Sequence, residues 1–500
     1  MDATGRRSTV DRFKNPLEGI ALGDPFVLRH RGRFYLYGTN DGPPLADGRE
    51  IPVFRSDDMI HWEPLGGALE PMDRSADHWA PEVLAWNGQF FMVVSFGDVD
   101  RKGHALWVAV ADQPEGPFQL RKRISAPDEQ FSIDGSWLLD DDGRLYLFRC
   151  LDFIAEADLP HGTGIVVQEM RDPFTPIGAP ATVLRAHVPW QLFEANRSMP
   201  LYGGRTFQEW TTIEGPAPVR RLGKYFCGYS GGNFSGAYGT GEAVADAPLG
   251  PYRDTRGQAG PIFGTIPGLV EGPGHFSVVQ PDLVHDWIVL HGRRPGESVR
   301  SVWLCPATWS VEGLNVGPLT DRPQAAPPLS QIRDRFDGPQ GLQPIGWTPE
   351  SGDWRLDGDG LRQRDPQAVA SLWRDGRELA GDWVAEVYVR LPETPTAVAG
   401  LILESDQGRV SLELDRVGVH FRQVDGQTHG ADLPTLGDEA FDHARYHAML
   451  VRRRSDRVEV RLDGVLVIAI ATVPRGDLRL ALYARGVAAF DALSVTGAHA

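Results

Sequence analysis

The stretch GRFYLY, residues 32–37, opens with a turn-forming glycine and continues as an unbroken run of aromatic and aliphatic side chains. Runs of this length and composition favour β-strands over helices. The pattern returns along the first 320 residues as GQFFMV (88–93), GRLYLF (143–148), GKYFCG (223–228) and, without the glycine, HDWIVL (285–290). Recurrence at intervals of about 55 to 80 residues indicates one structural unit repeated five times.

Further strands flank each copy of this run. An apolar strand precedes the first copy, as PFVL at residues 25–28, and another follows the second copy, as WVAVA at residues 107–111. The segments ADQPEGPF (111–118) and ADAPLGPY (245–252) also echo one another. Three or four strands in each of five units predict an all-β fold, a five-bladed β-propeller over residues 15–321. An open array of β-sandwiches with similar turns is the alternative, and helical architectures do not fit.

A proline-rich break follows the repeats and is typical of a linker, here expected at residues 322–334. Beyond it, short runs of alternating polar and apolar residues are separated by Gly- and Asp-containing turns, as in VSLEL at 410–414 and RVEVRL at 457–462. This pattern predicts a β-sandwich over residues 335–500.

Composition excludes several classes of function. The formal net charge of −17 argues against binding to a nucleic-acid backbone. No stretch reaches the roughly 20 apolar residues that span a bilayer, so no membrane contact is expected. The polar segment 1–15 has no apolar core of signal-peptide length after it, and we expect a cytoplasmic protein of unknown oligomeric state. The separated residues Cys150, Cys227 and Cys305 are expected to be buried free thiols.

Ionisable residues stand at or near the heads of the predicted first strands of all five blades. They are Asp24, Glu82, Asp134, Glu214 and His275. An ionisable side chain at the head of an apolar strand costs solvation free energy unless it has a role or a partner. A turn-capping role would explain any one of them alone. Because innermost strands line the central channel of a propeller, we expect the five side chains to converge at one mouth.

Two carboxyl groups across a pocket are the requirement for hydrolysis of a glycosidic bond. One must be ionised to activate water, and the other must be protonated to donate to the leaving oxygen. A third carboxylate can raise the pKa of the acid through like-charge repulsion. Aromatic side chains nearby would either offer apolar faces to sugar rings or pack between blades; they are Trp79, Trp137, Trp190 and Phe193.

Over about three fifths of the chain, residues 15–320, the order and content of these motifs resemble glycoside hydrolase family 43. Members of that family are five-bladed propellers that act on arabinose- and xylose-containing glycans. The motif GDP around Asp24 resembles the general-base segment. The motif IDGS around Asp134 resembles the segment whose aspartate tunes and positions the acid, and IEGP around Glu214 resembles the general-acid segment.

The resemblance extends to the last blade and to the second domain. The motif GPGH, ending at His275, resembles a segment whose histidine helps to hold a metal ion through water in some members. It implies a structural calcium ion near His275, and no cofactor that the chemistry requires. Arg300 resembles an arginine that contacts substrate. Substrate contacts are therefore expected from Trp79, Glu82, Trp137, Phe193, His275 and Arg300. The C-terminal domain resembles the concanavalin-like sandwich appended to some members.

A second Glu-Gly-Pro motif, residues 271–273, could be mistaken for the acid segment. Glu214 is preferred because it stands in blade four and because a YSGG strand and a PLGP turn follow it. Glu271 instead precedes His275, and we interpret it as a neighbouring turn residue.

The resemblance implies inversion in a single displacement, with the two reacting carboxyl groups about 6.5–9.5 Å apart. An exo-acting α-L-arabinofuranosidase that cuts arabinose- or xylose-containing oligo- or polysaccharides is the first expectation. β-Xylosidase is the second, and β-galactofuranosidase the third. A retaining fructan hydrolase would need an Asn-Asp-Pro nucleophile strand and a Glu-Cys acid segment, which are absent. A non-catalytic carbohydrate-binding propeller and a protein-interaction propeller remain as alternatives of another class.

Overall fold

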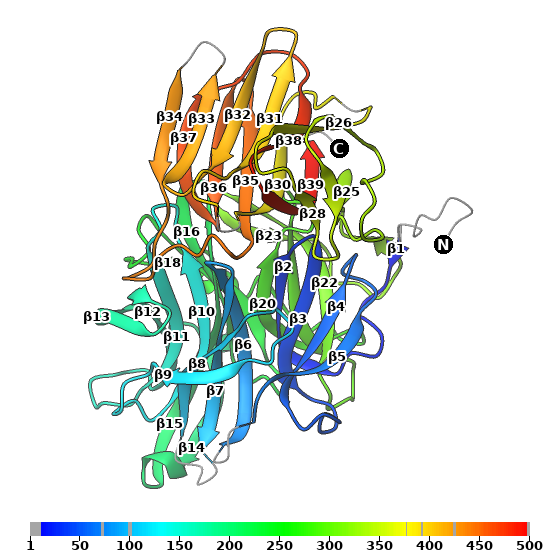
Figure 1. Ribbon diagram of the computed structural model, residues 1–500. Coiled ribbons are helices and arrows are strands. Elements are labelled where there is room, and N and C mark those ends of the chain that lie inside the picture. Colours follow the sequence, from blue (N-terminus) through cyan, green and yellow to red (C-terminus); the bar gives the residue numbers. More distant parts are fainter. Residues whose placement is uncertain are drawn as a thin grey trace.

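The computed structural model describes residues 12–71, 75–98, 103–376, 378–391, 394–423 and 427–497. Strands dominate these ranges, and the helices among them are three short 3₁₀ turns. Figure 1 shows two stacked bodies, one blue to green in the first half of the chain and one yellow to red in the second. The prediction of an all-β propeller followed by a β-sandwich is confirmed.

Three of the blades are four-stranded antiparallel meanders in which neighbours along the chain pair. Blade 1 consists of β2 (Leu22–His30), β3 (Arg33–Asn40), β4 (Glu50–Ser56) and β5 (Glu63–Leu69). Blade 2 consists of β6 (Ser75–Trp86), β7 (Gln89–Asp98), β8 (His104–Ala111) and β9 (Gln119–Arg123). Blade 5 consists of β20 (Glu271–Val279), β21 (Asp286–Arg293), β22 (Ser301–Ser310) and β23 (Gly313–Val316).

Blades 3 and 4 are joined into one ten-stranded sheet, because the start of β12 pairs in parallel with Thr211 and Thr212 in the middle of β15. Blade 3 consists of β10 (Ser132–Leu139), β11 (Leu145–Phe153), β12 (Gly162–Asp172) and β13 (Thr175–Leu184). Blade 4 consists of β15 (Arg205–Arg221), β16 (Lys224–Gly231), β17 (Gly239–Ala245), β18 (Arg253–Asp254), η3 (Gly257–Ala259) and β19 (Phe263–Gly264). Between the blades lie η1 (Pro189–Gln191), β14 (Leu192–Met199) and η2 (Pro200–Tyr202). This insertion accounts for the long interval between the third and fourth repeats.

The inner strand of every blade contains a bulge. The bulged residues have left-handed backbones, with φ of 50° at Asp24, 45° at Ala80, 55° at Asp134, 58° at Gly215 and 47° at His275. The strand register shifts at each of these positions. Bulges re-aim side chains and are common beside active sites. The same local backbone geometry therefore recurs in all five blades around the channel.

A ring of hydrogen bonds connects the bulges from blade to blade. In each blade, one residue of the second strand pairs with the residue that precedes the bulge on the first strand. We call these five residues the latch residues. They are Thr39, Ser95, Cys150, Ser230 and His291. At four of the five latches the bulge N–H of the next blade donates to the latch side chain: Ala80 to Thr39 (3.0 Å), Asp134 to Ser95 (3.0 Å), His275 to Ser230 (2.7 Å) and Asp24 to His291 (3.1 Å). The last of these bonds joins blade 5 to blade 1.

Further contacts close the ring at the same seam. The N–H groups of Leu17 and Leu22 donate to the carbonyl oxygens of Val302 and Arg300, at 2.8 and 3.0 Å. The amide of Asn15 exchanges two hydrogen bonds of 2.8 Å with the backbone of Leu304. Outside the blades, β1 (Arg12–Phe13) pairs with β24 (Gln324–Ala325). The chain before blade 1 is thus held against the last blade.

The second body consists of two sheets packed face to face. The eight-stranded sheet contains β25 (Ile332–Asp334), β27 (Trp354–Leu356), β28 (Leu361–Gln363), β30 (Trp383–Arg390), β35 (His447–Arg454), β36 (Arg457–Leu462), β37 (Val465–Thr472) and β39 (Ala488–Gly497). The seven-stranded sheet contains β26 (Trp347–Ser351), β29 (Val369–Arg374), β31 (Val398–Ser405), β32 (Gly408–Leu414), β33 (Gly418–Gln423), β34 (Thr428–Asp432) and β38 (Arg479–Arg485). A continuous apolar core lies between them, with Trp354 and Phe490 fully buried. Within the stretch expected to be a linker, β24 pairs with β1 and β25 pairs with β39.

The sandwich docks on the propeller at the end opposite the bulges. Its Arg333 and Arg445 donate to the carbonyl oxygens of Gly32 (3.0 Å) and Gly88 (3.1 Å), the turn glycines of the first two repeats. Its Arg461 pairs with Asp141, in the matching turn of blade 3, at 2.5 Å. Arg31, seven residues after Asp24, pairs with Asp491 of the sandwich. At about 3.3 Å per strand residue, the sandwich contact lies roughly 23 Å along the strand from Asp24.

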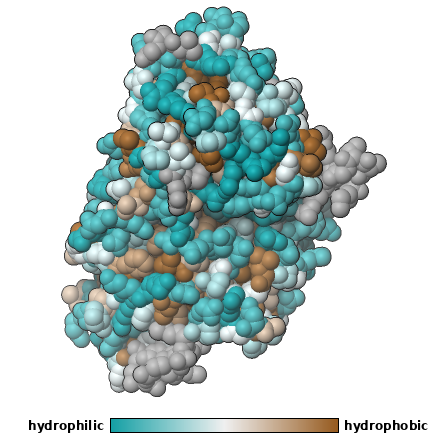
Figure 2. Space-filling view, viewed as in Figure 1, coloured by the Kyte–Doolittle hydropathy of each residue, from teal (hydrophilic) through white to brown (hydrophobic). Residues whose placement is uncertain are grey.

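The remaining observations concern the surface and the thiols. The face drawn in Figure 2 is mostly hydrophilic, with small separate hydrophobic patches. Among the described residues, no helix has the length and apolar character needed to cross a membrane. Cys150, Cys227 and Cys305 are buried free thiols, as the sequence predicts.

Candidate active site

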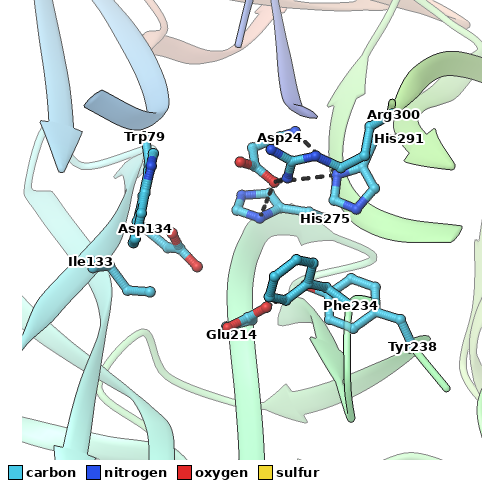
Figure 3. Close-up of a pocket in the computed structure, with 10 residues that line it drawn as sticks. All are labelled: Asp24, Trp79, Ile133, Asp134, Glu214, Phe234, Tyr238, His275, His291 and Arg300. Carbon is cyan, nitrogen blue, oxygen red and sulfur yellow. Dashed lines mark hydrogen bonds and ion pairs between the residues drawn. The ribbon is translucent and has the colours of Figure 1, made fainter. Parts of the chain in front are cut away.

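One cavity of about 210 Å³ opens among the inner strands of the propeller, at the end that carries the bulges. Figure 3 shows its walls, which come from all five blades. The lining residues are Asp24, Trp79, Ile133, Asp134, Glu214, Phe234, Tyr238, His275, His291 and Arg300. The structure therefore brings together the three carboxylates that the sequence singles out, although they are far apart in the chain. Among the described residues, none from the sandwich lines the cavity.

Asp24 is held by a dense set of partners. Its Oδ2 accepts a 2.6 Å hydrogen bond from the Thr39 hydroxyl. Its Oδ1 lies 2.9 Å from Nη1 of Arg300 and 3.1 Å from Nδ1 of His275. Burial alone would raise the pKa of Asp24, but the charges of Arg300 and His275 outweigh burial and hold the pKa well below its usual value. Asp24 is therefore an ionised carboxylate that the bulge aims into the cavity.

A close backbone approach places Arg300 against Asp24. The guanidinium also binds Asp41, with Nη2 to Oδ1 at 2.7 Å and Nε to Oδ2 at 2.9 Å. A Cβ added to Gly23 would lie 1.9 Å from Cζ of Arg300. Glycine is thus required at position 23, because any side chain there would push the guanidinium away from both carboxylates.

Glu214 has the opposite ionisation behaviour. It stands one residue before the bulge of blade 4, and its Oε1 accepts a 2.7 Å hydrogen bond from the Tyr238 hydroxyl. Burial, followed by the charge of Asp134, raises the pKa of Glu214 to about 8, although the Tyr238 bond acts to lower it. At neutral pH this carboxyl group is mostly protonated. It can donate a proton where Asp24 can only accept one.

Asp134 interacts by its charge with both Asp24 and Glu214. Its Oδ2 accepts a 3.0 Å hydrogen bond from the N–H of Gly215, the residue after Glu214. The thiol of Cys150, the latch residue of blade 3, lies 3.9 Å from the same oxygen. Burial raises the pKa of Asp134, and the charge of His275 opposes that rise. Asp134 therefore connects to the backbone beside Glu214 and raises the pKa of Glu214 by its charge.

His275 is a cation in this setting. Burial acts to lower its pKa, but the carboxylates of Asp24 and Asp134 raise it to about 9. A protonated imidazole has no lone pair for a metal ion. No group of three or more His, Cys, Asp and Glu side chains among the described residues is arranged to hold a metal. The described residues therefore offer no direct set of ligands for a metal; the calcium ion expected near His275, held through water, stays a prediction, and no step below depends on it.

Glu82 lies beside the cavity rather than on its wall. Its Oε2 accepts hydrogen bonds from the Ser136 hydroxyl (2.7 Å) and the Trp137 N–H (3.3 Å). It borders a separate space of about 10 Å³ that also touches Asp24, Asp134 and His275. That volume holds about one water molecule. Burial raises the pKa of Glu82 to about 8. Because Glu82 is not among the residues that line the cavity, direct contact with substrate is not supported for it.

The aromatic residues expected to bind substrate have three different positions. Trp79 lines the cavity, and its ring stacks on His104 with centroids 3.9 Å apart. Trp137 does not reach the cavity, since its ring packs in the apolar cluster between blades 2 and 3. Phe193 is one ring removed from the cavity, because it contacts Phe234, with centroids 6.2 Å apart. The expectation for Trp137 is corrected accordingly.

Sequence reasoning missed Phe234, Tyr238 and His291 as cavity residues. Phe234 and Tyr238 lie in the loop between β16 and β17, which carries no repeat motif. Nδ1 of His291 lies 3.1 Å from the backbone nitrogen of Asp24, whose N–H it accepts, and 3.2 Å from Oδ1 of the same residue. Burial lowers the pKa of His291 to about 4, in keeping with a neutral ring. One signal in the sequence could have identified His291. It pairs with Gly274 at the latch position, which Thr or Ser occupies in three of the other blades.

The cavity thus combines an ionised carboxylate, Asp24, with a protonated one, Glu214. Paired acids whose environments separate their pKa values in this way can serve as general base and general acid in one reaction. The remaining walls are apolar faces from Trp79 and Phe234. A cavity of about 210 Å³ has room for one small polar ring.

Comparison with known proteins agrees with this chemistry. The family model described as glycosyl hydrolases family 43 matches residues 13–314. An extracellular exo-α-(1→5)-L-arabinofuranosidase of Streptomyces avermitilis is 24% identical over 58% of this chain and 58% of its own length. A xylosidase/arabinosidase 43A of Humicola insolens is 26% identical over 26% of this chain and 44% of its own. The chain spans about half the length of the curated relatives it matches.

A solved structure is also similar. The crystal structure of a thermostable family-43 glycoside hydrolase superposes with a TM-score of 0.54 at 30% identity, over 63% of this chain and 99% of that one. Three relatives are named as extracellular enzymes. The expectation of a cytoplasmic location is therefore wrong, since the relatives contradict the inference drawn from the polar N-terminal segment.

Proposed function

Since this chain belongs to glycosyl hydrolases family 43 and is a glycoside hydrolase, we propose that it is an inverting, exo-acting α-L-arabinofuranosidase. The observation that carries the proposal is the pairing of ionised Asp24 with protonated Glu214 across one sugar-sized cavity. The name of the Streptomyces avermitilis relative supports the choice of sugar and of exo action. The alternative of a non-catalytic propeller falls away, because the family consists of hydrolases.

The proposed reaction is a single displacement at the anomeric carbon. Asp24 takes a proton from a water molecule as the water oxygen bonds to that carbon. The bond from the same carbon to the glycosidic oxygen breaks, and Glu214 transfers its proton to the departing oxygen. The products are a free pentose of inverted anomeric configuration and a shortened glycan. Solvent then removes the proton from Asp24 and restores the one on Glu214.

The other charged side chains set the two carboxyl groups for these tasks. Arg300 and His275 keep Asp24 ionised, so it stays a base at neutral pH. Asp134 keeps the pKa of Glu214 high, so the acid retains its proton. Such separation of two carboxyl pKa values is the electrostatic requirement for acid–base catalysis near neutral pH.

The size of the cavity supports cleavage at chain ends. Drug-sized ligand pockets have about 300–1,000 Å³, whereas this cavity has about 210 Å³ and is lined on all sides by the five blades. It suits one terminal pentose better than an internal stretch of polysaccharide. β-Xylosidase is the second candidate, favoured by the name of the Humicola insolens relative.

The test is a side-by-side assay of the purified chain on p-nitrophenyl α-L-arabinofuranoside, β-D-xylopyranoside and β-D-galactofuranoside. The arabinofuranoside should give the highest kcat/KM. Proton NMR of the sugar released early in the reaction should show the inverted anomer. A highest kcat/KM on xylopyranoside would shift the assignment to β-xylosidase, and a retained anomer would refute the single displacement.

A further inference from the structure

We infer that Phe234 and Phe193 form a platform for the leaving group, binding the sugar ring that departs rather than the pentose whose anomeric carbon reacts. The inference rests on the proposed function, since it uses Glu214 as the acid. Phe234 is 47% exposed although it lines the cavity. Ligand sites are lined mainly by apolar and aromatic side chains around a few polar groups, and Phe234 is such a ring at the edge of the cavity that holds the carboxylates.

The position of Phe234 relative to Glu214 identifies which sugar it would meet. The loop of residues 232–238 carries both Phe234 and Tyr238, and the Tyr238 hydroxyl binds Glu214 at 2.7 Å. In Figure 3, Phe234 lies on the Glu214 side of the cavity, and Asp24 lies on another side with Arg300 and His275. A general acid must reach the leaving oxygen within about 3 Å. The departing sugar must therefore begin beside Glu214, where the ring of Phe234 stands.

The loop is held in place before any ligand arrives. The side-chain amide of Asn233 donates to the carbonyl oxygen of Phe193 at 3.2 Å, and the N–H of Ser235 donates to Oδ1 of Asn233 at 2.8 Å. On its other side, the carbonyl oxygen of Gly236 accepts a 3.0 Å hydrogen bond from Thr265. These bonds keep the loop from collapsing over the cavity. A preorganised ring loses little conformational entropy when a ligand binds.

A second aromatic ring continues the platform away from the cavity. The ring of Phe193 lies 6.2 Å from that of Phe234, and the guanidinium of Arg197 lies 4.4 Å over Phe193. Phe193 and Arg197 belong to β14, the strand inserted between blades 3 and 4, which is largely exposed. Sugar rings present C–H faces to aromatic rings and hydroxyl groups to charged side chains. The stack of two rings and one guanidinium therefore suits a saccharide leaving group.

The experiment compares two substrates that share the terminal pentose and differ in the leaving group. They are α-(1→5)-linked arabinobiose, which leaves a sugar, and methyl α-L-arabinofuranoside, which leaves only methanol. Phe234→Ala and Phe234→Leu should each lower kcat/KM on arabinobiose by about ten-fold and lower it by a clearly smaller factor on the methyl glycoside. Phe234→Tyr should keep both values. Inhibition by free arabinose should be unchanged in all three variants.

Controls separate this inference from the proposed function. Leu222→Ala removes another exposed apolar side chain, 63% exposed, in the turn at the other end of blade 4, and should leave kcat/KM on both substrates unchanged. Equal losses on both substrates, or weaker inhibition by arabinose, would overturn the leaving-group platform while the function stands. If the wild-type chain acts only on xylosides, the same comparison is made with xylobiose and methyl β-D-xyloside. A wild-type chain inert on all of these substrates would overturn the function and this inference together.

Discussion

Removing one hydroxyl group, in Tyr238→Phe, should move the basic limb of the pH–activity profile upwards. The hydroxyl donates a 2.7 Å hydrogen bond to Oε1 of Glu214 and acts to lower the pKa of that carboxyl group. Activity requires protonated Glu214, so kcat/KM of the wild type should fall as the pH rises through about 8. Without the hydroxyl, ionised Glu214 loses a stabilising partner, and the fall should come at higher pH.

The size of the shift follows from the type of bond lost. A hydrogen bond to a charged group contributes about 1.5–3 kcal/mol, and one pKa unit corresponds to about 1.4 kcal/mol. The basic limb should therefore move by about one to two units, to roughly pH 9–10. At pH 9 the wild type should keep about a tenth of its plateau kcat/KM, and the variant about half or more. Values of kcat/KM between pH 4 and 10.5 on the best p-nitrophenyl pentoside measure this directly.

Tyr229→Phe is the matched control, because the Tyr229 hydroxyl donates to Asp254 at 2.6 Å instead of to Glu214. Its basic limb should coincide with that of the wild type. An unmoved or lowered limb in Tyr238→Phe, in a variant that melts at the wild-type temperature, would refute the assignment of Glu214 as the titrating acid.

Four further results are expected. Asp24→Asn and Glu214→Gln should each lower kcat by about 10²–10⁴-fold with no loss of fold by circular dichroism; wild-type kcat in either would contradict their roles as base and acid. Asp134→Asn should move the basic limb to lower pH, since the charge of Asp134 raises the pKa of Glu214, and an unchanged pH profile would reject that role. His291→Ala should leave the buried Asp24 N–H without its acceptor, destabilising the fold by about 1–3 kcal/mol and lowering kcat more than it changes KM; calorimetry and steady-state kinetics check both, and an unaltered kcat would argue against positioning of Asp24. Trp354→Ala should destabilise the sandwich by about 3–5 kcal/mol in a urea titration while kcat/KM at 25 °C stays within two-fold, because Trp354 is fully buried there and the sandwich meets the propeller at its other end.

Repetition made most of the fold predictable. The turn glycines at residues 32, 88 and 143 recur at even spacing, and each introduces the second strand of a blade. Asp24, Asp134 and Glu214 were accessible for the same reason, since Asp24 and Asp134 occupy matching bulge positions on the inner strands and Glu214 stands one residue before the bulge of its blade. A pattern that repeats in the chain predicts positions that are equivalent in space, and the cavity combines those positions.

The side chains that sequence reasoning misplaced depend on backbone details with no compositional signal. The bulge in β10 shifts the register between Ile133 and Ser136, and Trp137 then packs between blades. Phe234 and Tyr238 come from a loop that the repeat does not contain. Each miss reflects tertiary contacts between blades that no local window of sequence contains.

The seam where the ring closes has a consequence for how the enzyme matures. Asp24 enters the ribosomal tunnel early, yet its latch His291 and its counter-ion Arg300 are synthesised more than 260 residues later. A nascent chain that has completed only four blades holds the base without the groups that keep it charged and aimed. Hydrolytic competence should therefore arrive in one step, when the fifth blade docks onto the first, and incomplete chains should be unable to attack glycans.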